Sequence, residues 1–306
     1  MSPQLRSAGR LARRILLGAG LAIFASISRA EDFHIGGALI DAQFTAPPAP
    51  ALQKVVDAWI KTSAKAVTTY YGAFPVHHVR LRLTPGAGHT PEGGQTFGWE
   101  GALIKITLGR DATAADLSDD WVLVHEMVHL ALPNVPERHH WLEEGLATYV
   151  EPIARGRAGQ LTPARVWNEM VENFPQGEPE KGDRGLDHTA TWGRTYYGGA
   201  LYCFRADIEI RRRTGNRRGL EDALRGVLAA GGSIETSWSI DRIIAAGDAA
   251  TGVPVLRELY DEMKDKPVRV DLNALWRQLG VRHQGHTVIF DDTAPLSAVR
   301  KAITGG

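Results

Sequence analysis

The run HEMVH, from His125 to His129, constrains this chain more than any other feature of its sequence. At about 100° of rotation per helical residue, His125 and His129 differ by about 40°, so both imidazoles project from one face of a helix. That spacing suits two ligands of a single tetrahedral Zn²⁺, and Glu126, one step around the helix, can reach a metal-bound water. The motif therefore predicts a helix here and a further ligand from elsewhere in the chain.

A candidate third ligand follows a short turn. A structural zinc site has four protein ligands, whereas a catalytic site has three and an open position. The segment WLEEGLATYVE, residues 141–151, offers Glu144 fifteen residues after His129, and the intervening turn LPNVPE can fold a second helix back onto the first. Residue 135 is Val135, where a HExxHxxGxxH site would have its third histidine, so that arrangement is disfavoured.

These two segments together resemble the gluzincin zinc metallopeptidases of peptidase clan MA, which include thermolysin-like enzymes and the M1 and M61 aminopeptidases. In that group HExxH is followed by a helix with xEGxA, whose Glu is the third zinc ligand. The resemblance implies one Zn²⁺ held by His125, His129 and Glu144, with Glu126 as the general base. Glu143 stands where the motif often has Asn, so it is expected beside the ligands or facing solvent.

A second resemblance concerns RTYYGGALY, residues 194–202, which is similar to the YxKGA helix of M1 and M61-type enzymes. The Tyr of that motif donates its hydroxyl to the oxyanion of the tetrahedral intermediate, and counting back from Gly199 assigns this role to Tyr196. Gly198 replaces the Lys of the motif, which leaves open whether Tyr196 or Tyr197 faces the metal. The alternative is that both tyrosines are core or rim residues.

Three further residues are candidates for substrate binding. GWEG, residues 98–101, is a weaker match to the GxMEN motif of M1 enzymes, and it implies that Glu100 binds the amino terminus of the substrate. Tyr197 and His188 are the other candidates, beside the simpler alternatives of an exposed Glu100 and a solvated His188. The strand after Glu100 is expected to pair with an extended peptide through its backbone.

The order of apolar patterns predicts an α+β fold, which the resemblance describes as a thermolysin-like catalytic domain with the zinc site in a cleft. A small lobe with a mixed sheet, residues 31–112, precedes a mainly helical lobe, residues 113–306. The expected strands are 33–45, 76–83, 102–108 and 287–290, with a Gly-rich connection before 102. The expected helices are 51–70, 115–132, 139–155, 162–173, 194–214, 217–230, 237–247, 252–264 and 271–279, and residues 175–189 are expected to form a surface loop.

The first thirty residues have the composition of an export signal. Four arginines precede an uncharged run from Ile15 to Ser28, and Ser28 and Ala30 are small residues suited to cleavage. We therefore predict that residues 1–30 are a signal peptide and that the protein is exported, periplasmic or extracellular. A retained amphipathic anchor is the alternative, and the Arg13–Arg14 pair also loosely resembles a twin-arginine signal.

The composition limits the classes of molecule that this chain is expected to bind. Residues 31–306 have 30 basic against 35 acidic side chains and no basic run, so nucleic-acid binding is disfavoured. A peptide or protein is the expected substrate, no stable membrane insertion is expected after signal cleavage, and the oligomeric state stays open. The leading hypothesis is an exported zinc-dependent metallopeptidase, a hydrolase of peptide bonds and a candidate aminopeptidase. The alternatives are a non-catalytic gluzincin-like envelope binding protein, or a helical protein in which HEMVH is accidental.

Overall fold

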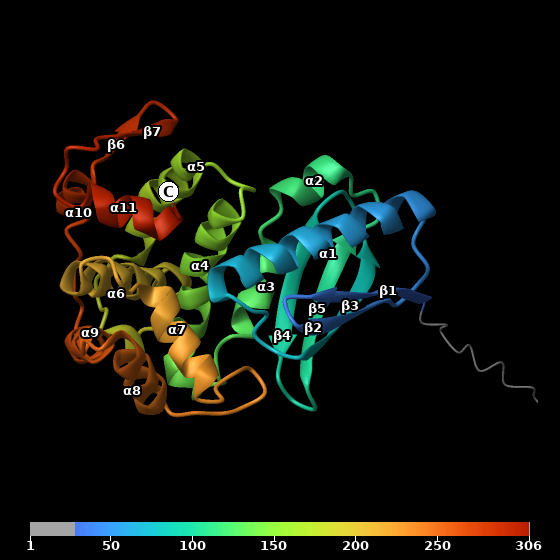
Figure 1. Ribbon diagram of the computed structural model, residues 1–306, viewed down its shortest axis with the longest axis horizontal. Helices are drawn as coiled ribbons and strands as arrows, with labels where there is room; N and C mark the ends of the chain where they lie inside the picture. The colour runs from blue at the N-terminus through green and yellow to red at the C-terminus, as the bar shows by residue number, and fades with distance from the viewer. Residues whose placement is uncertain (1–27, 306) are drawn as a thin grey trace, which may run out of the picture.

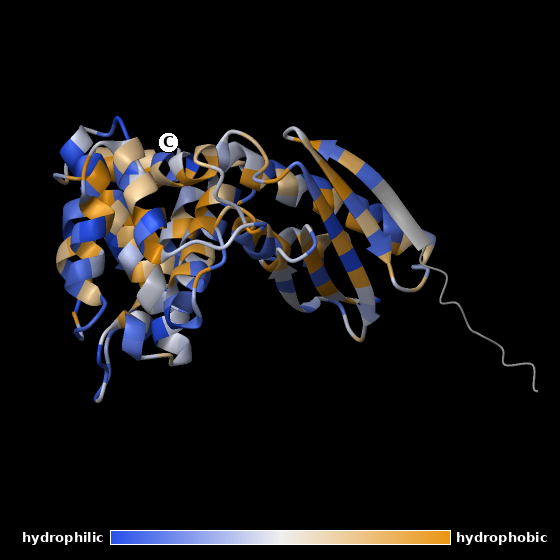
Figure 2. Ribbon diagram, turned by 90° about the horizontal axis from the view of Figure 1, so that it is seen from below, coloured by the Kyte–Doolittle hydropathy of each residue, from blue (hydrophilic) through white to orange (hydrophobic). Residues whose placement is uncertain are grey.

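A sheet lobe and a helical lobe divide residues 28–305, the part of the chain that the computed structural model describes. The five-stranded sheet and helix α1 (Pro50–Tyr71) form the first lobe, and from α2 (Ala114–Asp119) onwards the chain is almost entirely helical (Figure 1). The predicted order, a mixed sheet with one helix followed by a helical lobe, is confirmed. Figure 2 shows hydrophobic and hydrophilic residues alternating along the strands, as expected where one face of a sheet is buried.

The sheet has the spatial order β1-β2-β3-β5-β4. β1 and β2 are antiparallel, β2, β3 and β5 are parallel neighbours, and β4 is antiparallel to β5. The strand bounds are β1 (Ser28–Ile35), β2 (Ala38–Phe44), β3 (His78–Gly86), β4 (Pro91–Phe97) and β5 (Ala102–Gly109). Residues 33–45 were expected as a single strand, but Gly36 and Gly37, with φ of 60° and 89°, turn this segment into a hairpin.

The sequence pattern did not predict strand β4. Its sequence PEGGQTF reads as a Gly-rich connection, yet it pairs with β5 and forms one edge of the sheet. Because β5 pairs with β3 on its other side, the expectation that the strand after Glu100 would offer its backbone to a peptide is wrong. The edge of the sheet on this side is β4, and β1 forms the opposite edge.

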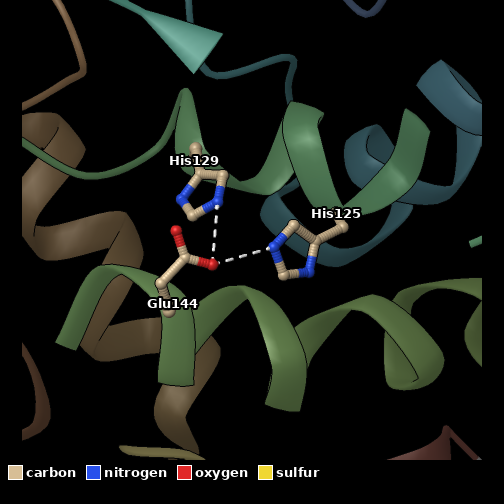
Figure 3. Close-up of side chains that lie close together, drawn as sticks. All are labelled: His125, His129 and Glu144. Atoms are coloured by element: carbon tan, nitrogen blue, oxygen red, sulfur yellow. Dashed lines mark hydrogen bonds and ion pairs between the residues drawn. The ribbon is translucent and has the colours of Figure 1, made fainter. Parts of the chain in front are cut away.

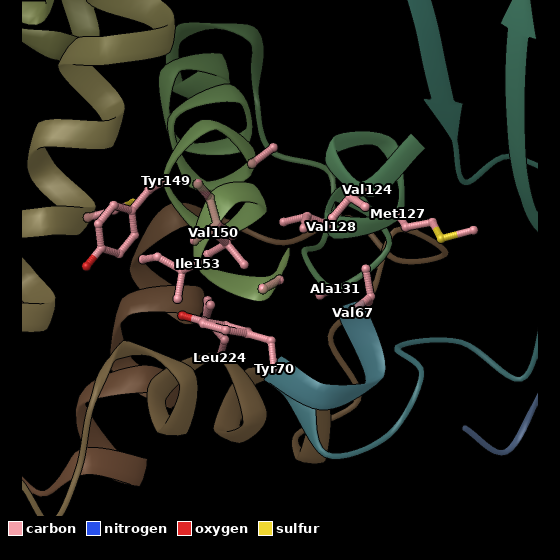
Figure 4. Packing of buried hydrophobic residues seen from close by; sticks show 14 of the residues in the cluster. Val67, Tyr70, Val124, Met127, Val128, Ala131, Tyr149, Val150, Ile153 and Leu224 are labelled. Atoms are coloured by element: carbon pink, nitrogen blue, oxygen red, sulfur yellow. The ribbon is translucent and has the colours of Figure 1, made fainter. Parts of the chain in front are cut away.

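The helical lobe packs its apolar faces onto α1. Figure 4 shows side chains of α1, α3 (Val122–His129), α4 (His140–Arg157) and α7 (Leu220–Ala229) meeting in one buried cluster, with Val67, Val128 and Val150 fully buried. The remaining helices are α5 (Pro163–Asn173), α6 (Gly199–Thr214), α8 (Ile240–Thr251), α9 (Val255–Met263), α10 (Leu272–Leu279) and α11 (Ser297–Thr304). The hairpin β6 (Val281–Gln284) and β7 (Thr287–Phe290) precedes α11, and the sequence pattern had indicated only the second of these strands.

The helix expected over 115–132 is in fact two helices, and Asp120 explains the break. Its carboxylate accepts hydrogen bonds from the backbone N–H groups of Val122 and Leu123, at 3.1 and 3.3 Å. Asp and Asn side chains favour helix starts because they satisfy N–H groups that have no intrahelical partner. The Trp59 indole of α1 also donates to Asp120, at 3.1 Å, so this cap fixes the start of α3 relative to the first lobe.

Two glycines allow α4 and α6 to cross at very close range. A Cβ on Gly145 would lie 2.3 Å from the Gly199 backbone, and one on Gly199 would lie 1.9 Å from the Trp141 carbonyl oxygen. Only hydrogen fits at either position. The crossing places Glu144 of α4 next to the residues that immediately precede α6.

We expect Gly145→Ala to destabilise the protein by about 1–3 kcal/mol, because the new methyl group forces the two helices apart. Alanine normally stabilises a helix relative to glycine, so a loss of stability in this variant would itself indicate the close helix crossing. Gly156→Ala, in the same helix, is the matched control, since its Cβ would approach only the end of the Val166 side chain, at 3.0 Å. Equilibrium urea unfolding measures both, and equal stability of the two variants would contradict the tight crossing.

The predicted signal peptide, residues 1–30, lies outside the described residues except for its last three positions, which are part of β1. It stays a prediction. Among residues 28–305, none of the helices combines the length and the apolar character needed to cross a membrane.

Candidate metal centre

Three side chains from two helices converge on one point (Figure 3). His125 Nε2 and His129 Nε2 of α3 lie 3.2 and 3.7 Å from Glu144 Oε2 of α4. One potential ligand atom from each residue lies within 4.8 Å of the other two, and the three side chains are buried or nearly so. Two imidazole nitrogens and one carboxylate oxygen in this arrangement can hold a metal ion, and they suit Zn²⁺.

The protonation states favour metal binding. Burial lowers the pKa of His129 to about 3, so its imidazole is neutral at physiological pH. Burial alone would raise the pKa of Glu144, but the hydrogen bond with His125 and the neighbouring His129 outweigh it and lower this pKa. Metal ligands must be deprotonated, so a neutral His129 imidazole and an ionised Glu144 carboxylate favour metal binding.

Glu126 lies on α3 between the two histidines and faces the sheet. The Thr96 hydroxyl of β4 is 2.7 Å from Glu126 Oε2 and 2.9 Å from the Glu126 carbonyl oxygen. Gly94 of the same strand gives the side chain room, since a Cβ there would lie 2.4 Å from Glu126 Cγ. Burial raises the pKa of Glu126, although the Thr96 hydrogen bond opposes the shift. A carboxylate with a raised pKa is a better proton acceptor near neutral pH.

Tyr196 lies beside the carboxylate of Glu144. Residues 194–198 form a single π-helical turn just before α6, where the sequence pattern had predicted a continuous α-helix. π-Turns of this kind often occur at functional sites. Burial, together with the charge of Glu144 and a hydrogen bond to it, raises the pKa of Tyr196 to about 12. Its hydroxyl is therefore protonated and able to donate a hydrogen bond.

Two neighbours of the centre come from the start of α4. His140 Nδ1 lies 3.0 Å from Glu143 Oε2, and its Nε2 lies 3.5 Å from Glu144 Oε1. Glu143 Oε1 also accepts the N–H of Val135 at 3.1 Å, so this carboxylate holds the turn that leads into α4. Glu143 thus lies beside the candidate ligands. This is one of the two positions expected for it, the other being a position that faces solvent.

The three candidates for substrate binding are not brought together. Glu100 is exposed on the turn between β4 and β5, where its carbonyl oxygen accepts a hydrogen bond from Arg80, and it does not line the metal cavity. His188 is also away from the cavity and pairs with Asp265 at 2.8 Å. Tyr197 lines a second cavity on the other side of Tyr196.

The metal centre opens into a cavity of about 530 Å³ between the lobes. Its walls are β4, α3 and the start of α4, with Tyr196 and Ile234 closing the remaining sides. Thr96 and Gly94 also contribute to this site, and the sequence pattern did not indicate them because it did not predict strand β4.

Solved structures of zinc peptidases share this fold. An aminopeptidase N family protein from Idiomarina loihiensis superimposes with a TM-score of 0.64 at 12% identity, covering 85% of this chain and 50% of that chain. An M1 zinc metallopeptidase from Deinococcus radiodurans gives a TM-score of 0.53 at 15% identity, covering 80% and 52%. A mutant of that metallopeptidase bound to a Tyr-Ser-Ala substrate gives 0.52 at 14% identity, with the same coverages.

The chain therefore spans about half the length of these solved proteins. At such low identities the likeness shows the fold alone, which is that of M1-type zinc peptidases. No protein-family model matches the sequence, and no curated protein matches it.

Proposed function

We propose that this protein is a zinc-dependent peptidase that hydrolyses peptide bonds. One observation carries the proposal: His125, His129 and Glu144 converge on a point that Glu126 and Tyr196 flank. The fold shared with M1 zinc peptidases supports it. A purely structural or binding metal site needs no buried carboxylate beside its ligands, so the position of Glu126 favours an enzyme over the binding protein considered above.

The donor set fits zinc, since two imidazole nitrogens and one carboxylate oxygen match a catalytic site with an open position. When bound, zinc supplies Lewis acidity and lowers the pKa of water. The chain supplies the proton transfers. Glu126 takes the proton of the attacking water and returns it to the leaving amine, while the Thr96 hydroxyl holds the carboxylate in place. The Tyr196 hydroxyl donates a hydrogen bond to the oxygen that gains negative charge.

The substrate backbone is assigned to β4. This strand pairs with β5 on one side only, and Gly93 to Phe97 line the metal cavity. An extended peptide can add to such an edge through main-chain hydrogen bonds. Gly93 and Gly94 have no side chains to obstruct that approach.

Chelation tests the proposal. The purified chain, loaded with one equivalent of zinc, is expected to cleave members of a mixed peptide library, with products identified by mass spectrometry. Removing the metal with a chelator is expected to stop cleavage, and adding zinc back is expected to restore it. Cleavage that continues without metal, or a zinc-loaded protein that cleaves no peptide, would refute the proposal.

Replacing Tyr196 by Phe is expected to lower kcat by about 10²–10³-fold, the usual loss for one hydrogen-bond donor to an oxyanion. KM should change little, because the hydroxyl acts mainly in the transition state. Tyr197→Phe is the control, and its kcat should stay near that of the wild type. If Tyr197→Phe shows the larger loss, the roles of the two tyrosines are reversed.

We also propose, from the first thirty residues alone, that the protein acts outside the cytoplasm. Fractionation of the producing cells, with the amino terminus of the exported form sequenced, tests this. An unprocessed amino terminus in the cytoplasmic fraction would contradict it.

A further inference from the structure

A second cavity adjoins the metal centre. It has a volume of about 490 Å³ and shares Trp121, His125 and Tyr196 with the metal cavity. The two spaces thus meet at a metal ligand and at the proposed oxyanion donor. If a peptide lies along β4 with its scissile bond at the metal, a side chain next to that bond can reach the second cavity.

One part of the second cavity is lined by apolar and aromatic side chains. Met170 and Phe174 of α5 and the following turn form a buried wall, and Tyr197 adds a half-buried ring. Trp192 covers one side, with its ring centroid 5.7 Å from that of Tyr196 and 5.4 Å from that of Tyr197, although its own side chain is 60% exposed. Apolar and aromatic side chains that line a cavity beside a reactive centre favour an apolar ligand group.

The charged residues of this cavity are already paired with one another. At the floor, Arg155 donates to the buried Glu151 at 2.9 Å and to the Ser118 carbonyl oxygen at 3.1 Å. At the rim, Arg165 pairs with Asp119 at 2.6 Å and with Glu169 at 3.0 Å. A charged ligand group entering the cavity would lose its water and would have to compete with these pairs, which is costly.

We propose that the second cavity is a specificity pocket that binds a bulky uncharged side chain, aromatic or large aliphatic, of the residue next to the scissile bond. This inference rests on the proposed peptidase function and adds to it the class of side chain selected. Trp192 forms the outer wall of the pocket, since its ring contacts Tyr196 and Tyr197 and is otherwise open to solvent.

Pentapeptide amides test the pocket. In two series, X-Ala-Ala-Ala-Ala and Ala-X-Ala-Ala-Ala, X is Phe, Leu, Ala, Glu or Lys, and each peptide is made with a free and with an acetylated amino terminus. Cleavage next to X is expected to have a kcat/KM about 10–100-fold higher for Phe or Leu than for Ala, with Glu and Lys no better than Ala. Equal rates for Phe and Ala, or the highest rate for Lys or Glu, would overturn the proposal.

Two tryptophan variants test whether the second cavity determines the preference for Phe over Ala. Trp192→Ala is expected to reduce the preference for Phe over Ala about 10-fold, mainly through a higher KM for the Phe peptide. Trp99→Ala removes another exposed tryptophan, 84% exposed and outside both cavities, and should leave the preference intact. Equal effects of the two variants would overturn the assignment of the pocket.

Binding separates this inference from the proposed function. Titration calorimetry of zinc-loaded Glu126→Gln with the Phe and Ala peptides needs no turnover. If no peptide is cleaved by the wild type but the Phe peptide binds at least 10-fold more tightly, the peptidase proposal fails and the pocket stands. If peptides are cleaved but binding and rates do not distinguish Phe from Ala, the pocket fails and the peptidase proposal stands.

Discussion

Glu126→Gln is expected to lower kcat by about 10²–10⁴-fold while the protein keeps its zinc. Glutamine has nearly the same shape as glutamate and can still meet the Thr96 hydroxyl, which is 2.7 Å from Glu126 Oε2. What it loses is the capacity to take a proton. Because Glu126 is not one of the three converging donors, the metal site should stay intact. Steady-state kinetics and elemental analysis of the same preparation measure the two properties together.

The control for this variant is Glu262→Gln, which removes a carboxylate from α9 that pairs with Arg205 at the surface, at 2.9 Å. Exposed pairs contribute about 0–1 kcal/mol, so the control should keep both activity and zinc. An active Glu126→Gln protein would mean that another group accepts the proton. A variant that lost zinc as well as activity would show that Glu126 supports the metal site rather than the chemistry.

The convergence of the three candidate ligands could be predicted from the sequence largely because helical geometry fixes two of them locally. His125 and His129 lie on one face of any helix, so their convergence needs no knowledge of the rest of the chain. Glu144 required only that a second helix fold back. The structure adds the reason for its accurate placement, since Gly145 lets α4 touch the backbone at Gly199 and so sets Glu144 beside Tyr196.

The sheet side of the metal cavity could not be predicted in the same way. Strand β4 has alternating exposure only in part, and its two central glycines resemble a loop, because its pairing with β5 rather than its own side chains makes it a strand. Because the pattern did not predict β4, it could not predict the contact of Thr96 with Glu126 or this edge of the sheet. Glu100 was expected at the site because GWEG resembles the GxMEN motif, but it is exposed on the turn between β4 and β5 and does not line the metal cavity.

Tertiary contacts also decided where helices end. The apolar period through residues 115–132 is continuous, so it predicts one helix. Asp120 ends that continuity by capping α3 and by accepting a hydrogen bond from Trp59, a residue sixty-one positions earlier in the chain. A capping side chain inside an apolar pattern is visible in a sequence, but whether it caps a new helix or stays solvated depends on such distant partners.

Glu144→Ala is expected to reduce the zinc content of the purified protein from about one equivalent to a small fraction, with a parallel loss of activity. Glu144 Oε2 is the atom that approaches both histidines, at 3.2 and 3.7 Å, so its removal leaves two ligands of three. The ligand also balances the charge of the ion in a mostly buried site, where an uncompensated charge is costly. Elemental analysis after dialysis against a weak chelator gives the zinc content directly.

Glu143→Ala is the matched control, because it removes the adjacent carboxylate of the same helix. The oxygens of Glu143 face His140 and the Val135 N–H, so this variant should keep near-stoichiometric zinc, although partners outside the ligand set can weaken affinity by about 10–100-fold. If both variants retain zinc equally, Glu144 is not a ligand. If the wild type itself takes up no zinc, even with added metal, the three-ligand centre is not a metal site, and the peptidase proposal falls with it.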